Sequence, residues 1–308
     1  MRVLLTGGTG LLGRAIIRQA AREAPGVELL APPRADLDLL DRAALRAWFN
    51  ANRVDAVIHS AARVGGIQAN LDDPEGFLID NLRLDDALMS AADAAGVGRL
   101  IYIGSSCMYP RDHRQPLVEE DLLAGPLEPS NEGYALAKIV GAKRCAAISA
   151  AKGRAWRTII PCNLFGVDDH FGSHGAHLVA AAIAKIVEAR DNGAGSVTIW
   201  GDGHARREFL EADHLARFLL RILPDLSTLP DCLNVGAGRD HAVNDYYRMI
   251  ADVAGYDGAF THDLSRPAGM SAKLISSDRA AMFGYRPPED LTAALSRAVA
   301  ACERGRVN

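Results

Sequence analysis

The sequence predicts an α/β fold: a doubly wound, mainly parallel sheet with a smaller C-terminal domain interleaved with it. Two observations predict this class. Short apolar runs typical of buried strands alternate with helical patterns through the first half of the chain, and the joins between them are short. After Cys162 this alternation ends, and a polar, histidine-bearing stretch leads to an alanine-rich helix. We therefore expect two domains whose segments alternate along the chain.

Composition narrows the class of protein. A chain of 308 residues with a hydrophobic share of 49% can bury a substantial core. No apolar run reaches the roughly 18 to 20 residues that cross a bilayer, and no secretory leader follows Met1, so we expect a cytoplasmic protein without membrane contact. A net charge of −4 offers no basic excess for nucleic acid. Five cysteines without paired or metal-type spacing predict free thiols and no metal site.

The predicted strands of the sheet are short runs of branched and aromatic residues. They cover residues 2–6, 27–31, 56–62, 100–104, 156–161 and 234–238. The glycine-rich stretch 63–70 is predicted to be a loop. In the C-terminal part we expect a helix from residue 178 to about 190, a strand at 197–200, and a segment at 206–210 that returns toward a helix near residue 213.

The loop between the first strand and the first helix predicts dinucleotide binding. Gly7, Gly10 and Gly13 would let the chain turn tightly, bring backbone N–H groups against a pyrophosphate and pack the helix on the strand. Leu11 and Leu12 open the helix, whose N-terminus favours anions, and they complete the predicted cofactor contacts of this loop. Ala61 ends a later strand in small residues, where a cofactor must come close.

The end of the second strand bears on the choice between NADPH and NADH. A carboxylate that would bind the ribose 2′-hydroxyl of NAD is missing directly after this strand, whereas Arg34 could pair with the 2′-phosphate of NADP. The sequence therefore favours NADP(H). Asp36 and Asp38 lie close by and keep NADH open.

Three polar side chains predict the chemistry. Ser105 follows a buried strand, at the sheet edge where ligands bind in open parallel sheets. Tyr134 and Lys138 are four residues apart and share one side of a predicted helix. We expect the Lys138 ammonium to lower the pKa of Tyr134, so that Ser105 holds a carbonyl while Tyr134 donates its proton. Beside a hydride donor, these residues would reduce a ketone.

Two further expectations concern the surroundings of these residues. The helix that contains Tyr134 is predicted to bury Leu136, Ile139 and Val140. Asn81 would steady the catalytic region from a neighbouring helix, although a solvent-facing asparagine is nearly as consistent with the pattern.

The glycine loop together with Ser105, Tyr134 and Lys138 resembles the extended short-chain dehydrogenase/reductases that act on nucleotide sugars. More narrowly, five segments resemble the GDP-L-fucose synthases, a family of dual epimerase–reductases. These segments run in order through the chain, at residues 61–67, 104–110, 127–132, 161–166 and 207–210. The sequence departs from that family at Thr9, where arginine is frequent, and at Gly133, which replaces a proline.

The resemblance implies a Rossmann sheet and a defined reaction. Such enzymes invert C3 and C5 of GDP-4-keto-6-deoxy-D-mannose and reduce its C4 ketone with NADPH. Cys107 and His177 match the acid–base pair of the inversion. The family commonly forms homodimers through helices that correspond to residues 84–95 and 134–150, so a homodimer is expected.

The resemblance also implies binding residues. Arg207 and Lys185 are candidates for the substrate phosphates, and Lys273 for the sugar or nucleotide. Trp200 would either pack beside the base or anchor its strand. Lys138, Asn163 and His177 are also predicted cofactor contacts.

These assignments divide the chain by role and leave two alternatives. Residues 1–163, with returning segments at about 210–238, would bind the dinucleotide, and residues 164–209 and 239–308 the substrate. One alternative is an enzyme for a related deoxy- or heptose-type GDP-sugar, or one that only epimerises or only reduces. The other is a catalytically silent NADP-binding regulatory protein, against which the complete set of Ser105, Tyr134 and Lys138 argues.

Overall fold

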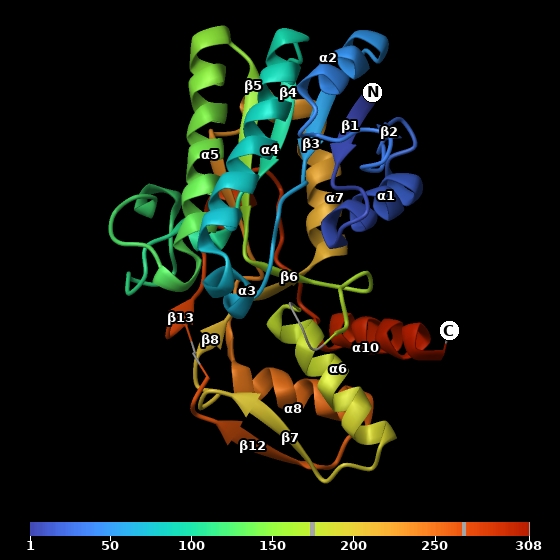
Figure 1. Cartoon of the computed structure of the whole chain (residues 1–308), viewed down its shortest axis with the longest axis vertical. Helices are drawn as coiled ribbons and strands as arrows, with labels where there is room; N and C mark the ends of the chain where they lie inside the picture. The colour runs from blue at the N-terminus through green and yellow to red at the C-terminus, as the bar shows by residue number, and fades with distance from the viewer. Residues whose placement is uncertain (173–175, 267–268, 308) are drawn as a thin grey trace.

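The structure is a computed structural model that describes residues 1–172, 176–266 and 269–307. A sheet flanked by helices forms one end of the molecule in Figure 1, and a smaller group of helices and strands forms the other. The sheet has six parallel strands in the order β10-β5-β4-β3-β1-β2. Their bounds are β1 Arg2–Thr6, β2 Glu28–Leu30, β3 Ala56–His59, β4 Arg99–Ile103, β5 Ala155–Pro161 and β10 Cys232–Val235.

This topology confirms the predicted α/β class with its doubly wound parallel sheet. After β2 the chain crosses back over β1 to form β3, so the strand order reverses between β1 and β3. Ligands bind outside the carboxyl ends of strands at such a switch point. The predicted third strand is too long, because the chain leaves the sheet after His59 and residues 60–62 turn toward this crevice.

Helices cover both faces of the sheet. On one face α2 (Arg42–Ala51) packs on α4 (Pro74–Ala94), which packs in turn on α5 (Glu132–Lys152). On the other face α1 (Leu11–Glu23) packs on α7 (Ala212–Ile222). The stretch predicted as a loop at 63–70 is only partly irregular, because α3 (Ile67–Asp72) begins within it. The Asn70 side chain donates to the carbonyls of Gly65 and Gly66 and closes the turn before this helix.

The predicted buried face of α5 is partly wrong. Ile139 is buried, but Leu136 and Val140 are 38% and 52% exposed. Two residues correspond to roughly 200° around a helix, so Leu136 lies almost opposite Tyr134. The side of α5 that faces the protein carries Lys138 and Ile139 among small residues, including Ala135 and Ala142.

The C-terminal part has its own core of buried apolar side chains, which includes Phe165, Ile183, Tyr246 and Leu295. Its helices are α6 (Leu178–Asp191), α8 (Val243–Ala254) and α10 (Leu291–Val307), with the short α9 (Asp278–Ala281) beside β10. Its strands pair as β7 (Ser196–Trp200) with β12 (Ala259–Asp263), and as β8 (Arg206–Arg207) between β11 (His241–Ala242) and β13 (Ala272–Lys273). A further pair, β6 (Asn163–Phe165) and β9 (Phe209–Glu211), joins the two parts. The division into domains by role stays a prediction.

The length and polarity of the helices bear on membrane insertion. Across the residues that the structure describes, no helix is both long enough and apolar enough to span a bilayer.

Glu208, between β8 and β9, is fully buried and ties distant segments together. Its carboxylate accepts hydrogen bonds from the backbone N–H groups of Gly238 and Ile275, at 2.8 and 3.1 Å. Its backbone carbonyl accepts from the Asn163 side chain. Burial raises the pKa of Glu208 to about 7, although these backbone donors oppose the rise.

This buried carboxyl predicts a pH-dependent stability. Between about pH 4.5 and 7 the folded protein keeps a proton that the unfolded chain has lost, so the free energy of unfolding falls as the pH rises through that window, by roughly 3 kcal/mol. In Glu208→Gln we expect this slope to disappear, and Glu188→Gln, at an exposed position on α6, should keep it. Denaturant unfolding at pH 5 and pH 8 measures the difference. Equal slopes in the wild type and Glu208→Gln would contradict the assignment.

Candidate active site

A cavity of about 1300 Å³ opens at the carboxyl ends of the central strands. It is lined by the glycine loop after β1, the segments after β3 and β4, the first turns of α5 and the residue before α6. Most of the predicted cofactor and catalytic residues line it, namely Gly7, Gly10, Leu11, Leu12, Arg34, Ala61, Ser105, Cys107, Tyr134, Lys138, Asn163 and His177. The fold thus brings residues from opposite ends of the predicted dinucleotide region into one space.

The glycine loop is built so closely that two of its glycines have no room for a side chain. Gly7 has a φ of +72°, and a Cβ there would lie 2.7 Å from the backbone nitrogen of Ala61. A Cβ on Gly13 would lie 2.0 Å from the Gly7 carbonyl oxygen, so Gly13 packs beneath the loop. The N-terminus of α1 follows Gly10, which has no side chain with which to cap it, so its first backbone N–H groups are suited to a phosphate.

Two arginines line the cavity beside this loop. Arg34 is mostly exposed and lies 3.5 Å from a carboxylate oxygen of Asp38. Arg14, which was not predicted, donates through Nε to the carbonyl of Thr9 at 2.9 Å. A second guanidinium therefore lies beside Thr9 in the glycine loop.

Ser105 and Tyr134 meet where β4 ends. Ser105 precedes a short 3₁₀ turn (Ser106–Met108), and its Oγ accepts a hydrogen bond from the Cys107 backbone at 3.2 Å. Tyr134 is partly exposed to the cavity, yet desolvation by the surrounding protein raises its pKa, and the charges of Cys107 and Asp85 raise it further. A hydrogen bond with Ser105 opposes the rise. The prediction of a lowered pKa for Tyr134 is therefore wrong, because burial dominates.

Lys138 lies one turn along α5 from Tyr134 and is buried. Its Nζ is 6.0 Å from the centre of the Tyr134 ring and 4.7 Å from that of Tyr102. Burial lowers the pKa of Lys138, whereas the negative charge of Asp85 raises it. Gly133, just before Tyr134, has no room for a side chain, since a Cβ there would lie 2.5 Å from the Pro74 carbonyl oxygen. The close approach of α4 to α5 explains why glycine stands at this position.

Cys107 has two nitrogen donors at its sulfur. Asn131 Nδ2 lies 3.2 Å and Lys273 Nζ 3.5 Å from Sγ, and Lys273 comes from β13 at the far end of the chain. Burial lowers the pKa of Arg207, and the charge of Cys107 opposes this effect. Arg207 is therefore close enough to Cys107 for the two groups to interact electrostatically. These two contacts fix the position of the Cys107 sulfur at the cavity.

His177 immediately precedes α6 and lines the cavity together with Cys107. Asp169 lines it too and acts on the same histidine: burial raises the pKa of Asp169, and the charge of His177 opposes the rise. Asp169 was not predicted as a site residue. Its position in the polar stretch after β6 gives no signal in the sequence, and only the fold shows that it lines the same cavity as His177.

Lys185 and Trp200 form a separate group that does not line this cavity in the part of the chain described. Two cations lie close to the exposed Trp200 ring: Lys185 Nζ is 5.2 Å from the ring centre, and Arg266 Cζ is 4.9 Å from it. Lys185 also donates to the carbonyl of Thr198 at 3.1 Å. The Trp200 side chain is therefore in contact with two cations and stays 44% exposed.

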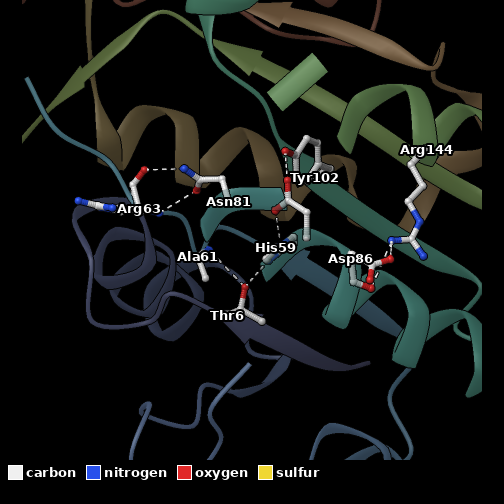
Figure 2. A network of polar contacts seen from close by, with 9 residues as sticks. Thr6, His59, Ala61, Arg63, Asn81, Asp86, Tyr102 and Arg144 are labelled. Carbon is white, nitrogen blue, oxygen red and sulfur yellow. Dashed lines mark hydrogen bonds and ion pairs between the residues drawn. The ribbon is translucent and has the colours of Figure 1, made fainter. Parts of the chain in front are cut away.

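Asn81 on α4 is fully buried, which decides between the two alternatives for it. Its Oδ1 accepts from the backbone N–H of Arg63 at 2.8 Å, and its Nδ2 donates to the carbonyls of Arg63 and Phe77 at 3.0 and 2.7 Å. Figure 2 shows the amide facing the Arg63 backbone. Asn81 thus holds the segment that leaves β3 along the cavity.

Comparison with known proteins gives the family. Residues 3–236 match the model of the NAD dependent epimerase/dehydratase family. GDP-L-colitose synthase of Yersinia pseudotuberculosis is 40% identical over 298 residues, 96% of each chain. GDP-L-fucose synthase of Azorhizobium caulinodans is 42% identical over 290 residues, 94% of this chain and 92% of that one.

Solved structures agree with this result. A GDP-L-fucose synthetase from Naegleria fowleri bound to NADP superposes with a TM-score of 0.87 at 26% identity and covers 100% of this chain and 94% of its own. A GDP-6-OMe-4-keto-L-xylo-heptose reductase from C. jejuni shares the fold, with a TM-score of 0.90 at 23% identity over 100% and 98% of the two chains. The chain belongs to the NAD dependent epimerase/dehydratase family.

Proposed function

We propose that the protein inverts C3 and C5 of GDP-4-keto-6-deoxy-D-mannose and reduces its C4 ketone with NADPH to give GDP-L-fucose. One observation carries the proposal. The cavity that contains the glycine loop also contains a tyrosine hydroxyl, with Ser105 beside it, and a thiol held by Lys273 and Asn131. Reduction and inversion can therefore share one bound sugar.

The residues present fit NADP(H). The loop around Gly7 allows a close backbone approach, the start of α1 suits the pyrophosphate, and Arg34 and Arg14 suit the 2′-phosphate. The similar Naegleria fowleri protein has been solved with NADP bound. When bound, NADPH supplies the hydride for the ketone carbon.

The reduction follows from the state of Tyr134. Because the pKa of Tyr134 is raised, the phenol holds its proton at neutral pH and acts as the proton donor to the carbonyl oxygen. The Ser105 hydroxyl, hydrogen-bonded to Tyr134, orients that oxygen. The Lys138 ammonium offsets the charge that remains on the phenolate.

The inversion uses the same ketone. C3 and C5 both flank C4, so loss of a proton from either places charge on the carbonyl oxygen, where Ser105 and Tyr134 stabilise it. Cys107 removes the proton, aided by the donors at its sulfur, and His177 returns one from the other face. Each inversion therefore exchanges one carbon-bound hydrogen with solvent.

A second candidate is the synthesis of GDP-L-colitose. The similarity to the Yersinia pseudotuberculosis protein, 40% identical over 96% of both chains, favours it as much as similarity to the fucose synthases favours the first. Colitose is a 3,6-dideoxy sugar with no stereocentre at C3. An enzyme for it inverts only C5, and this difference separates the two candidates.

Product analysis in D₂O tests the proposal. With GDP-4-keto-6-deoxy-D-mannose and NADPH, we expect NADPH oxidation and a product that carries deuterium at both C3 and C5, identified by NMR. Turnover of the 3-deoxy substrate alone, with deuterium retained at inverted C5, would favour GDP-L-colitose. Reduction without deuterium at either carbon would remove the epimerase role, and no NADPH oxidation with either sugar would refute the proposal.

The cofactor preference gives a prediction for Arg34. In Arg34→Ala we expect NADPH to bind about tenfold to a hundredfold more weakly, because one charge-assisted contact to the 2′-phosphate is lost, while NADH binding stays the same. Titration calorimetry with both cofactors measures this. Arg46→Ala, on the exposed side of α2, is the matched control and should change neither affinity. An equal loss for NADPH and NADH would contradict the role of Arg34.

We further propose that the protein is a homodimer that pairs through α4 and α5. The exposed Leu136 and Val140 supply an apolar stripe on α5 that a second copy would cover. Size-exclusion chromatography with light scattering tests this, and a monomer at micromolar concentration would contradict it.

A further inference from the structure

A line of hydrogen bonds leads from the glycine loop to a buried carboxylate beneath the catalytic residues. The Ala61 N–H lies 3.2 Å from Thr6 Oγ1, which lies 2.7 Å from His59 Nδ1. His59 Nε2 lies 3.0 Å from Asp85 Oδ1, and the Tyr102 hydroxyl lies 2.5 Å from Asp85 Oδ2. Figure 2 shows this line from Ala61 through Thr6 and His59 toward Tyr102. All but Ala61 are buried.

Two of these hydrogen bonds have a fixed direction. A carboxylate only accepts, so the Tyr102 hydroxyl donates to one oxygen of Asp85 and His59 Nε2–H donates to the other. Thr6 Oγ1 accepts from the Ala61 N–H and shares a further hydrogen bond with His59 Nδ1. Asp85 therefore receives a donor on each oxygen and is held as the charged carboxylate.

The charge of Asp85 acts on the two residues of the proposed proton donor. Burial acts to raise the pKa of Asp85, but the Lys138 charge and the contacts to His59 and Tyr102 outweigh burial, and the net pKa is lowered. In return, Asp85 raises the pKa of Lys138 against the effect of burial. Asp85 also adds to the raised pKa of Tyr134. One fixed negative charge thus strengthens the hold of both groups on their protons.

We propose that Asp85 is a positioning residue whose buried carboxylate keeps Tyr134 and Lys138 protonated, the form that delivers a proton to a ketone. The inference rests on the proposed function, since it assigns the reductive direction of the same site. During reduction the proton leaves the Tyr134 oxygen for the carbonyl oxygen while the hydride forms the new C–H bond, and Lys138 stays charged beside the phenolate. Asp85 touches neither substrate nor cofactor and acts through these two residues.

The other titratable groups around the pair are few. Cys145 on α5 acts on both Lys138 and Tyr102, and burial raises the pKa of its thiol, so it is neutral near pH 7. Burial also raises the pKa of Tyr102, with Asp85 adding to the rise, so Tyr102 is a neutral phenol. Cys107 faces Tyr134 from the turn after β4. Asp85 is the carboxylate among the groups that act on Lys138 and Tyr134.

Hydrogen bonding alone does not explain a carboxylate at this position. A neutral amide at residue 85 could accept from Tyr102 and donate to His59 if the histidine changed tautomer. Burying a charge is instead unfavourable unless an opposite charge offsets it. Lys138 supplies that charge, because its Nζ lies 4.7 Å from the centre of the same Tyr102 ring whose hydroxyl donates to Asp85.

The test is the pH profile of Asp85→Asn, a change that removes the charge and keeps the shape. Without the charge the Lys138 ammonium releases its proton more readily, so we expect the alkaline limb of the pH profile of kcat for NADPH oxidation, where this ammonium is lost, to move about one pH unit lower. The loss of rate above the limb should be about tenfold greater than the loss below it. An unshifted limb, or an equal loss at all pH values, would show that Asp85 has only a structural role.

Two variants separate charge from structure. Asp86→Asn makes the same change one residue along α4, where the half-exposed carboxylate pairs with Arg42 and Arg144, and should leave the limb in place. Tyr102→Phe removes a hydrogen bond to Asp85 but keeps its charge, so it should lower stability without moving the limb. A limb that moves equally in Tyr102→Phe and Asp85→Asn would overturn the proposal.

Two measurements need no substrate, so they stand even if the proposed reaction is wrong. Ultraviolet difference titration of the wild type against Tyr134→Phe isolates the ionisation of Tyr134, and repeating it in Asp85→Asn should show ionisation at lower pH. If Asp85→Asn alone does not fold, the double variant Asp85→Asn/Lys138→Met is used instead. It leaves no buried charge without its opposite charge, so it should have a higher melting temperature than either single variant. A double variant no more stable than either single one would refute the coupling of these charges.

Discussion

Tyr134→Phe is expected to lower kcat for NADPH oxidation by about 10²- to 10⁴-fold, the range that a lost general acid costs. The ring remains, so the packing of α5 against the sheet is kept, but no proton can reach the carbonyl oxygen from this position. NADPH affinity should be unchanged, because the glycine loop and Arg34 are untouched. Stopped-flow kinetics with the 4-keto substrate and a separate cofactor titration measure both quantities.

A second tyrosine, which follows the turn after β4, provides the control. Tyr109 is buried, and its hydroxyl donates to Asn234 Oδ1 at 2.7 Å, away from Ser105. Tyr109→Phe should cost stability yet keep kcat within a few fold of the wild type. If Tyr134→Phe turned over as fast as Tyr109→Phe, the role given to Tyr134 would be lost.

Cys107→Ser is expected to lower deuterium uptake at C3 and C5 by about 10²- to 10⁴-fold, since a serine hydroxyl is a far weaker base than a thiolate. Ser105, Tyr134 and Lys138 remain, so the variant should still oxidise NADPH with a ketone that needs no inversion. The measurement compares isotope exchange by NMR with NADPH oxidation in the same samples.

A different thiol supplies the matched control. Cys232, in the edge strand β10, lies away from the cavity lining, and Cys232→Ser should leave isotope exchange unchanged. Undiminished exchange in Cys107→Ser would assign proton removal to another group. Loss of exchange and reduction together would show that the sulfur serves binding rather than inversion.

The sheet and the loop were predictable because their signals are local. An apolar strand that ends in Thr6 and leads through Gly7 into a helix has few structural alternatives, and the same holds for the run that stops at Gly104. The spacing of Tyr134 and Lys138 placed them correctly on one side of α5. Their pKa values could not be predicted, because the sign depends on burial, which a spacing does not report.

The residues that sequence analysis missed depend on contacts between distant segments. Asp85 had one local signal: together with Asn81, Leu88 and Ala92 it lies on the buried stripe of α4, where an acidic residue is unexpected. Its hydrogen-bond partners come from β3 and β4, and the partners of Cys107 also lie elsewhere in the chain, with Lys273 166 positions away. The error about Leu136 and Val140 has the same origin, since apolar character does not reveal which side of a helix faces the protein.

The contact between Cys107 and Lys273 joins residues that lie far apart in the chain, so the inversion is more easily lost than the reduction. The proton donor Tyr134, with Ser105 and Lys138, lies within the first 140 residues, whereas the thiol depends on a strand near the end of the chain. Any loosening of that distal strand, by heat or by a change in the late segments, would impair isomerisation first. A partly damaged enzyme would then release sugars reduced with their original stereochemistry, and side products would report the damage before overall turnover fell.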